Sequence, residues 1–69
     1  MKYSSKDKNL DKQTLSFIQN QLNYENLLYK KYLAYSDMCL DNELKTICYK
    51  ASKRHKENYN NLISYLENC

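Results

Sequence analysis

Glu25 and His55 are the two residues of this chain whose types and positions most directly suggest chemistry. Each interrupts a row of apolar side chains spaced three or four residues apart, the spacing of one face of an α-helix. A carboxylate and an imidazole on facing helices either bind a metal ion or form a buried polar pair. Because a hydrogen-bonded pair is already satisfied without metal, we favour the polar pair and keep a metal site as the alternative.

The metal alternative follows the pattern of di-metal helical bundles, in which a Glu on one helix joins a Glu-x-x-His motif on another. Glu25 and His55 fit this pattern, but Ser52 stands where the second Glu would be. One hairpin therefore offers two ligands, and a symmetric dimer would offer four around one Fe or Zn ion. Cys48, seven residues before His55, is a weaker ligand candidate.

The elements that carry these residues are two long amphipathic helices. The apolar spacing predicts helices over about residues 10–38 and 42–68, after a flexible tail over residues 1–9. Asp41 is a suitable N-cap for the second helix. Gly and Pro are both absent, which argues against β-hairpins and phosphate-binding loops. The sequence thus predicts one all-α domain over residues 10–69, an antiparallel two-helix hairpin.

We use the word seam for the row of side chains that each helix turns toward the other. The seam predicted for the first helix is Leu15, Ile18, Leu22, Glu25, Tyr29, Tyr32 and Ser36. The seam predicted for the second helix is Leu44, Cys48, Ala51, His55, Asn58, Leu62, Tyr65 and Cys69. With a turn near residue 40, facing residues have numbers that sum to about 80, so Glu25 is expected to face His55.

A second apolar stripe on each helix makes the hydrophobic surface too wide for a single partner helix. We therefore expect two hairpins to form a homodimeric four-helix bundle. The residues predicted for this interface are Phe17, Tyr24, Leu28, Tyr35, Tyr59, Ile63 and Leu66. Seven of the eight tyrosines fall within the two predicted helices, and tyrosines at helical spacing suit such an interface, since each keeps its hydroxyl in contact with water. Oxidative tyrosine cross-linking within an assembly is the alternative role.

Composition argues against several other functions. The net charge is +3 and the lysines are dispersed, so no nucleic-acid partner is expected. No apolar run is long enough to span a membrane, and the first residues lack the apolar segment of a signal peptide. We expect synthesis in the cytoplasm and no membrane partner.

The three cysteines fit neither a disulfide framework nor a zinc ribbon, because their number is odd and no Cys-x-x-Cys pair occurs. The redox states of Cys39, Cys48 and Cys69 are left open. Cys48 and His55 share a helix face but lie about 10 Å apart along the axis, too far for direct proton transfer. We therefore expect no enzymatic activity.

Three short motifs are typical of one protein family. They are Glu25-x-x-x-Tyr29-x-x-Tyr32, Asp41-Asn42-Glu43-Leu44 and His55-x-x-x-Tyr59-x-x-Leu62. With these motifs, residues 25–66 resemble the coat-F domain of spore coat proteins, although Asn42 stands where the common family form has Pro. The resemblance implies a dimeric ferritin-like hairpin without established enzymatic activity, located in a spore coat with other coat proteins. Ser52 departs from the iron-binding Glu-x-x-His pattern of ferritin-like relatives.

The leading hypothesis is therefore a non-enzymatic structural or interaction module that acts as a dimeric helical bundle. A metal-binding bundle is the second hypothesis. The third is a regulatory hairpin that inhibits a signalling partner by placing a helix in its groove.

Overall fold

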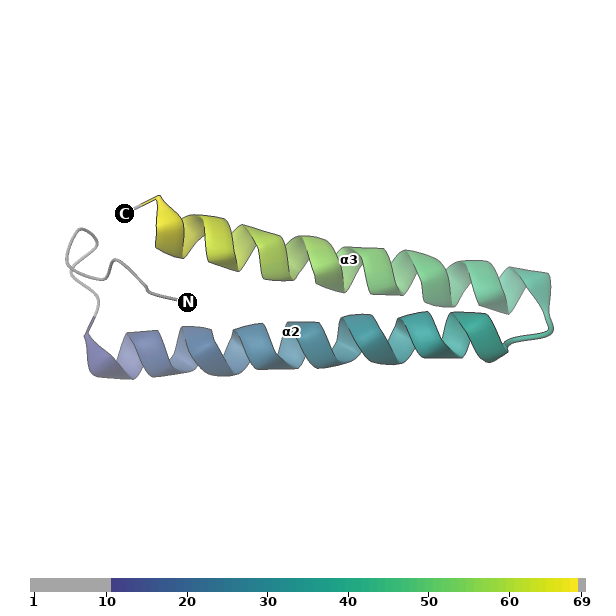
Figure 1. The fold of residues 1–69 in the computed structure, drawn as a ribbon, viewed down its shortest axis with the longest axis horizontal. Coiled ribbons are helices and arrows are strands. Elements are labelled where there is room, and N and C mark those ends of the chain that lie inside the picture. Colours follow the sequence, from purple (N-terminus) through teal and green to yellow (C-terminus); the bar gives the residue numbers. More distant parts are fainter. Residues whose placement is uncertain (1–10, 69) are drawn as a thin grey trace.

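The computed structural model describes residues 11–68 and shows two long antiparallel α-helices (Figure 1). Helix α2 spans Lys12–Met38 and helix α3 spans Asn42–Glu67. The described residues contain no strand. The prediction of an all-α helical hairpin is confirmed. The tail expected over residues 1–9 lies outside the described residues.

Aspartate side chains begin both helices by satisfying backbone N–H groups that have no partner within the helix. The Asp11 carboxylate accepts a 2.7 Å hydrogen bond from the Thr14 amide, and the Asp41 carboxylate accepts one of 2.8 Å from the Leu44 amide. The bond from the Thr14 backbone is the main reason that the pKa of Asp11 is lowered. The N-cap predicted at Asp41 is confirmed.

The turn is held by contacts between the end of α2 and the start of α3. The Cys39 amide donates to the Tyr35 carbonyl oxygen at 3.0 Å and ends α2. The Lys45 ammonium then reaches back from α3 and donates to the Ser36 carbonyl oxygen at 2.7 Å. A lysine at this position satisfies one of the carbonyl groups that a helix leaves free at its C-terminus.

The seam of α2 lies where its spacing predicts. Its buried residues are Ile18, Leu22, Glu25 and Ser36, all members of the predicted row. On α3 the buried residues are Cys48, Ser52 and Leu66, of which only the first belongs to the predicted row.

Along much of α3 the buried row lies one residue later in the sequence than predicted: Ser52 is buried in place of Ala51, and Leu66 in place of Tyr65. Tyr65 is 47% exposed, whereas Leu66 is fully buried and packs with Ile18 and Leu22. A leucine gains more from complete burial than a tyrosine, whose hydroxyl group favours contact with water. The choice between two adjacent residues is therefore decided by packing rather than by spacing.

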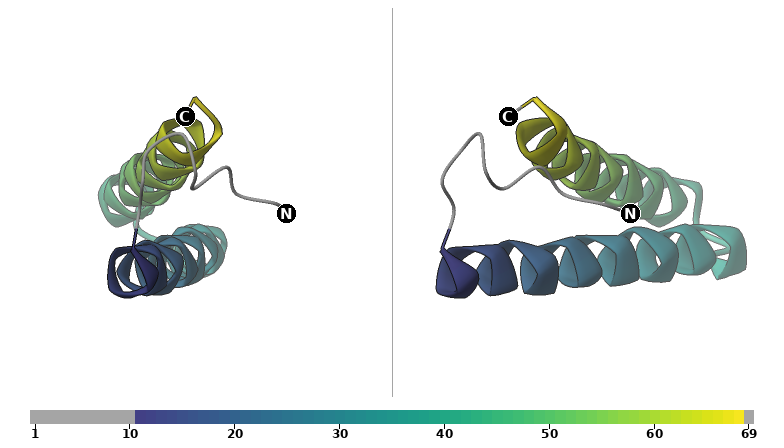
Figure 2. Two further views of the ribbon diagram at one scale, coloured as in Figure 1. Left: turned by 90° about the vertical axis from the view of Figure 1, so that its left-hand side faces the viewer. Right: turned by 60° about the vertical axis from the view of Figure 1, so that its left-hand side comes forward.

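The hairpin has two long sides, and the described residues place no third element over either of them (Figure 2). On one side, Tyr29 and Leu33 of α2 meet Tyr49 of α3; we call this the groove face. On the other side, Gln21 of α2 meets Asn58 of α3. Helical spacing from these two residues defines what we call the aromatic face. Its residues are Phe17, Gln21, Tyr24, Leu28, Tyr35, Ile47, Ala51, Asn58 and Tyr65.

Asp41→Ala is expected to lower the free energy of unfolding by about 1 kcal/mol, because it removes the N-cap of α3. Urea unfolding followed by circular dichroism at one protein concentration measures the change. Asp37→Ala is the matched control, since this exposed aspartate caps no helix N-terminus. Equal effects of the two substitutions would contradict the role of Asp41.

Candidate functional site

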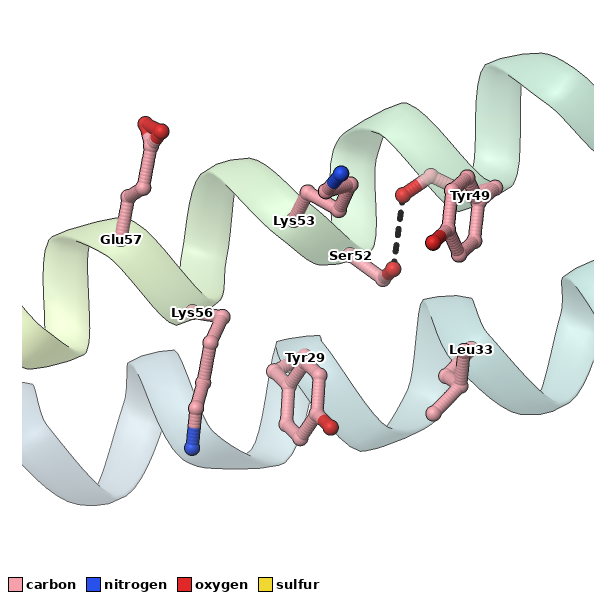
Figure 3. A pocket seen from close by; sticks show the side chains of 7 residues that line it. All are labelled: Tyr29, Leu33, Tyr49, Ser52, Lys53, Lys56 and Glu57. Atoms are coloured by element: carbon pink, nitrogen blue, oxygen red, sulfur yellow. Dashed lines mark hydrogen bonds between the residues drawn. The ribbon is translucent and has the colours of Figure 1, made fainter.

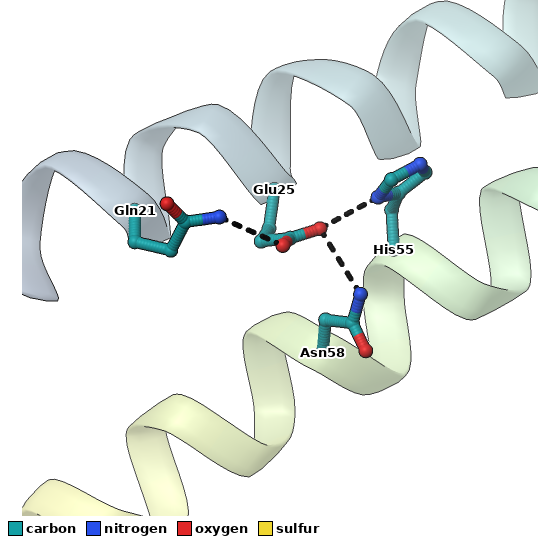
Figure 4. Close-up of polar contacts among 4 residues, drawn as sticks. All are labelled: Gln21, Glu25, His55 and Asn58. Atoms are coloured by element: carbon teal, nitrogen blue, oxygen red, sulfur yellow. Dashed lines mark hydrogen bonds and ion pairs between the residues drawn. The ribbon is translucent and has the colours of Figure 1, made fainter.

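The polar centre of the hairpin is a cluster around the Glu25 carboxylate (Figure 4). Glu25 Oε1 lies 2.6 Å from His55 Nδ1 and 3.4 Å from the donating Asn58 Nδ2. Glu25 Oε2 accepts a 3.0 Å hydrogen bond from Gln21 Nε2. The predicted meeting of Glu25 and His55 is confirmed, and both oxygens of the carboxylate are engaged.

Helical spacing explains how four polar groups meet at one point. Gln21 and Glu25 are four residues apart on α2, and His55 and Asn58 are three apart on α3, so each pair occupies one helix face. Glu25 is only 7% exposed. Burial of a carboxylate is costly unless hydrogen bonds replace the lost water. Among the described residues no buried side-chain nitrogen or oxygen lacks a hydrogen-bond partner, so this requirement is met.

The His55 ring is held from a second direction by an aromatic contact. Its plane lies within 4° of the Tyr32 ring plane, with ring centroids 5.7 Å apart. Tyr32 in turn makes an edge-to-face contact with Tyr35 at 6.2 Å. Stacking and the hydrogen bond to Glu25 together fix the orientation of the imidazole.

Sequence reasoning did not identify Gln21, Asn58 or Tyr32 as partners of the pair. For Gln21 and Asn58 the available signal was their spacing of four and three residues from Glu25 and His55, because polar residues at these distances on a helix are neighbours. Tyr32 contacts His55 from the other helix and gave no such signal. Asparagine and glutamine are common in this chain, so that signal could not single out these two amides before the helices were placed.

Opposing effects act on the pKa of Glu25. Burial on its own raises the pKa, whereas the hydrogen bonds from His55, Gln21 and Asn58 and the charge of His55 lower it. The net result is a pKa below the ordinary value of 4.5. The carboxylate is therefore ionised at neutral pH and stabilises the folded state in that form.

The structure separates Cys48 from the Glu25–His55 pair. Among the described residues, no group of three or more His, Cys, Asp or Glu side chains is placed to hold one metal ion. Burial raises the pKa of the Cys48 thiol, and the neighbouring Cys39 thiol raises it further. A thiol with a raised pKa is a poor metal ligand and a poor nucleophile, because the thiolate is the reactive form.

The residues predicted for a dimer interface fall into two groups. Those of α2 lie on the aromatic face: Phe17 is 66% exposed, Tyr24 54% and Tyr35 42%, and Leu28 is half-buried beside them. Those of α3 pack inside the hairpin: Leu66 is fully buried, and Tyr59 and Ile63 are half-buried against it. Leu66 therefore offers no surface to a second copy, and Ile47 and Tyr65 are the exposed apolar residues that α3 adds to the aromatic face.

No protein-family model, curated protein or solved structure matches this chain. The fold and the site define its class as an all-α helical hairpin with a buried carboxylate–imidazole pair. The described part of the chain contains no helix long and apolar enough to cross a membrane. The likeness to the coat-F domain stays a prediction.

Glu25→Gln is expected to flatten the pH dependence of stability below about pH 4.5. The pKa of Glu25 is lowered in the folded protein, so its stabilising effect is complete above the unfolded value and is lost as the pH falls through the folded value. Urea unfolding between neutral and acidic pH measures this slope. The slope of Glu25→Gln should be smaller than that of the wild type by up to about 1 kcal/mol per pH unit.

Glu57→Gln is the control for this experiment, because Glu57 is an exposed carboxylate on α3 that lies outside the polar cluster. It should leave the slope close to that of the wild type. If Glu25→Gln and the wild type lose stability in parallel on acidification, Glu25 is not held as a stabilising carboxylate.

Proposed function

We propose that this protein is a non-enzymatic interaction module that acts as a homodimer, in which two hairpins form a four-helix bundle through their aromatic faces. The observation that carries the proposal is the set of large apolar side chains left exposed on that face. Phe17, Tyr24 and Tyr35 project from α2, and Ile47 and Tyr65 from α3. Contiguous apolar surface with many aromatic residues is typical of protein interfaces.

The small core of a single hairpin supports the same proposal. Among the described residues, the buried hydrophobic side chains are Ile18, Leu22, Cys48 and Leu66. A core of this size supplies little stability, and small domains commonly depend on a partner or a covalent staple for the remainder. Burial of a second apolar face against another copy would supply it at roughly 25 cal/mol per Å².

Two members of the polar cluster, Gln21 and Asn58, belong to the aromatic face that a second copy would cover. Gln21, Glu25 and Asn58 line a shallow hollow of about 290 Å³ on the side that carries the aromatic face. Polar groups at a helical interface restrict the ways in which helices can align, because a misaligned partner leaves them unsatisfied. We propose that this cluster helps to select one arrangement of the two hairpins.

A metal ion bound between two copies is the second candidate, and the geometry of His55 is the observation that favours it. Its Nδ1 atom is paired with Glu25, and a carboxylate at one ring nitrogen commonly orients a histidine that binds metal through the other. In this arrangement His55 of each copy is a ligand, while Glu25, which the sequence suggested as a second ligand from each copy, orients the imidazole. Fe or Zn retained by the dimer through dialysis, and lost in His55→Gln, would support this candidate.

The partners beyond a second copy follow from the resemblance alone. Likeness to the coat-F domain carries the proposal that the dimer joins other proteins of a spore coat. A regulatory hairpin that inhibits a signalling partner remains the alternative. A regulatory hairpin would have the mass of one chain in solution, because its aromatic face must stay free for the partner. The dimer proposal predicts the mass of two chains.

Tyr24→Lys is expected to weaken the dimer at least about tenfold, because it places a charge within the proposed interface. Sedimentation equilibrium over a concentration series should show a mass near twice 8.3 kDa for the wild type and a shift toward one chain in the variant. Circular dichroism checks that both remain helical.

Gln19→Lys is the matched control. Gln19 is exposed on the same helix, but it borders a hollow with Leu22 and Tyr59 on the side of the hairpin away from the aromatic face. It should leave the mass unchanged. A monomeric wild type, or equal weakening by the two substitutions, would contradict the proposed interface.

A further inference from the structure

The groove face carries a hollow between the helices, on the opposite side of the hairpin from the aromatic face. Its volume is about 370 Å³, which lies in the usual range for small-molecule sites. The walls are aromatic and aliphatic: Tyr29 and Leu33 stand on α2, and Tyr49 stands on α3 (Figure 3).

Ser52 creates the space for this hollow. It occupies a seam position of α3 with only 1% exposure, and its small side chain faces Tyr29 and Leu33 across the gap (Figure 3). The hydroxyl donates a 2.7 Å hydrogen bond to the Tyr49 carbonyl oxygen. The Ser52 hydroxyl at the base of the hollow therefore already has a hydrogen-bond partner, and an apolar group can lie against it.

Two lysines border the hollow at different places: Lys56 reaches across to α2, and the Lys53 ammonium stays beside α3 (Figure 3). The Lys53 ammonium lies 5.4 Å from the centre of the Tyr49 ring, and the Lys56 ammonium lies 5.0 Å from the Tyr29 ring and 5.5 Å from the Tyr59 ring. Among the described residues, the single ion pair is that of Glu25 with His55, so neither lysine is paired with a carboxylate.

Glu57 also borders the hollow, but its carboxylate points away from α2 (Figure 3). The two ammonium groups therefore rest on tyrosine rings while their charge is left for an anion from outside. Contact with an aromatic ring holds an ammonium group in place and does not neutralise it.

Lys56 also limits the size of the occupant. Its side chain extends from α3 across to the Tyr29 ring of α2 and closes one end of the hollow (Figure 3). A long helix cannot lie along a groove that is crossed in this way, whereas a short molecule can fill the space beyond the crossing.

We propose that this hollow binds a small amphipathic anion. Its apolar body lies between Tyr29, Leu33 and Tyr49, and its carboxylate or phosphate head group contacts the Lys56 ammonium group, while Lys53 adds positive charge from the α3 side of the hollow. This site is separate from the proposed dimer interface, because the two lie on opposite sides of the hairpin, and either can exist without the other.

A titration of isotope-labelled protein with decanoate, below the concentration at which it forms micelles, tests the proposal by nuclear magnetic resonance. We expect saturable shifts of the amide signals of Tyr49, Ser52 and Lys53. Decanol and decylammonium, which have the same chain without the negative charge, should bind at least about tenfold more weakly. Decyl phosphate distinguishes the head groups: tighter binding than decanoate assigns a phosphate ester, and weaker binding assigns a carboxylate.

Three variants locate the binding site. The double substitution Lys53→Gln/Lys56→Gln should weaken decanoate binding at least about tenfold, as should Tyr49→Ala, which removes an exposed wall of the hollow. Lys31→Gln/Lys50→Gln removes two exposed lysines that do not border the hollow and should leave affinity unchanged. Circular dichroism confirms that all three fold. Equal binding of decanol and decanoate, or equal weakening by the two lysine pairs, would overturn the proposal.

Discussion

The organisation of this hairpin depends on the hydrogen bond between Glu25 and His55. A carboxylate placed between two packed helices must be paired, because an unpaired buried charge costs several kcal/mol. A shift of α3 by one turn would move His55 and Asn58 away from Glu25 together. The apolar contacts of the seam would tolerate such a shift far better, since hydrophobic burial has no fixed direction. The pair therefore selects one alignment of the helices.

The alignment in turn gives the hairpin two different sides. One side gathers the exposed aromatic residues of α2 with Ile47 and Tyr65 of α3. The other places Ser52 opposite Tyr29 and leaves a hollow with a lysine edge. An apolar face suits a second protein surface, and a small hollow with unpaired positive charge suits a small anion. The two helices of the described residues thus present two surfaces of distinct chemistry.

Local patterns carried much of the prediction. The helices, the Asp41 cap, the seam of α2 and the meeting of Glu25 with His55 follow from periodicity and from an antiparallel turn near residue 40. The later position of the buried row on α3 does not, because Tyr65 and Leu66 are equally good seam candidates until both helices compete for the same space. The hollow above Ser52 was missed for a related reason: a gap depends on the side chains opposite a residue, and sequence spacing identifies a small residue without identifying its neighbours.

A double-mutant cycle on Glu25 and His55 tests the central claim most directly. The free energy of unfolding is measured at neutral pH and one protein concentration for the wild type, Glu25→Gln, His55→Gln and the double variant. If the pair selects the alignment, the two substitutions should be coupled by about 1–3 kcal/mol. Additive effects of the two substitutions would show that the residues act independently, and the alignment would then have to come from the apolar seam alone.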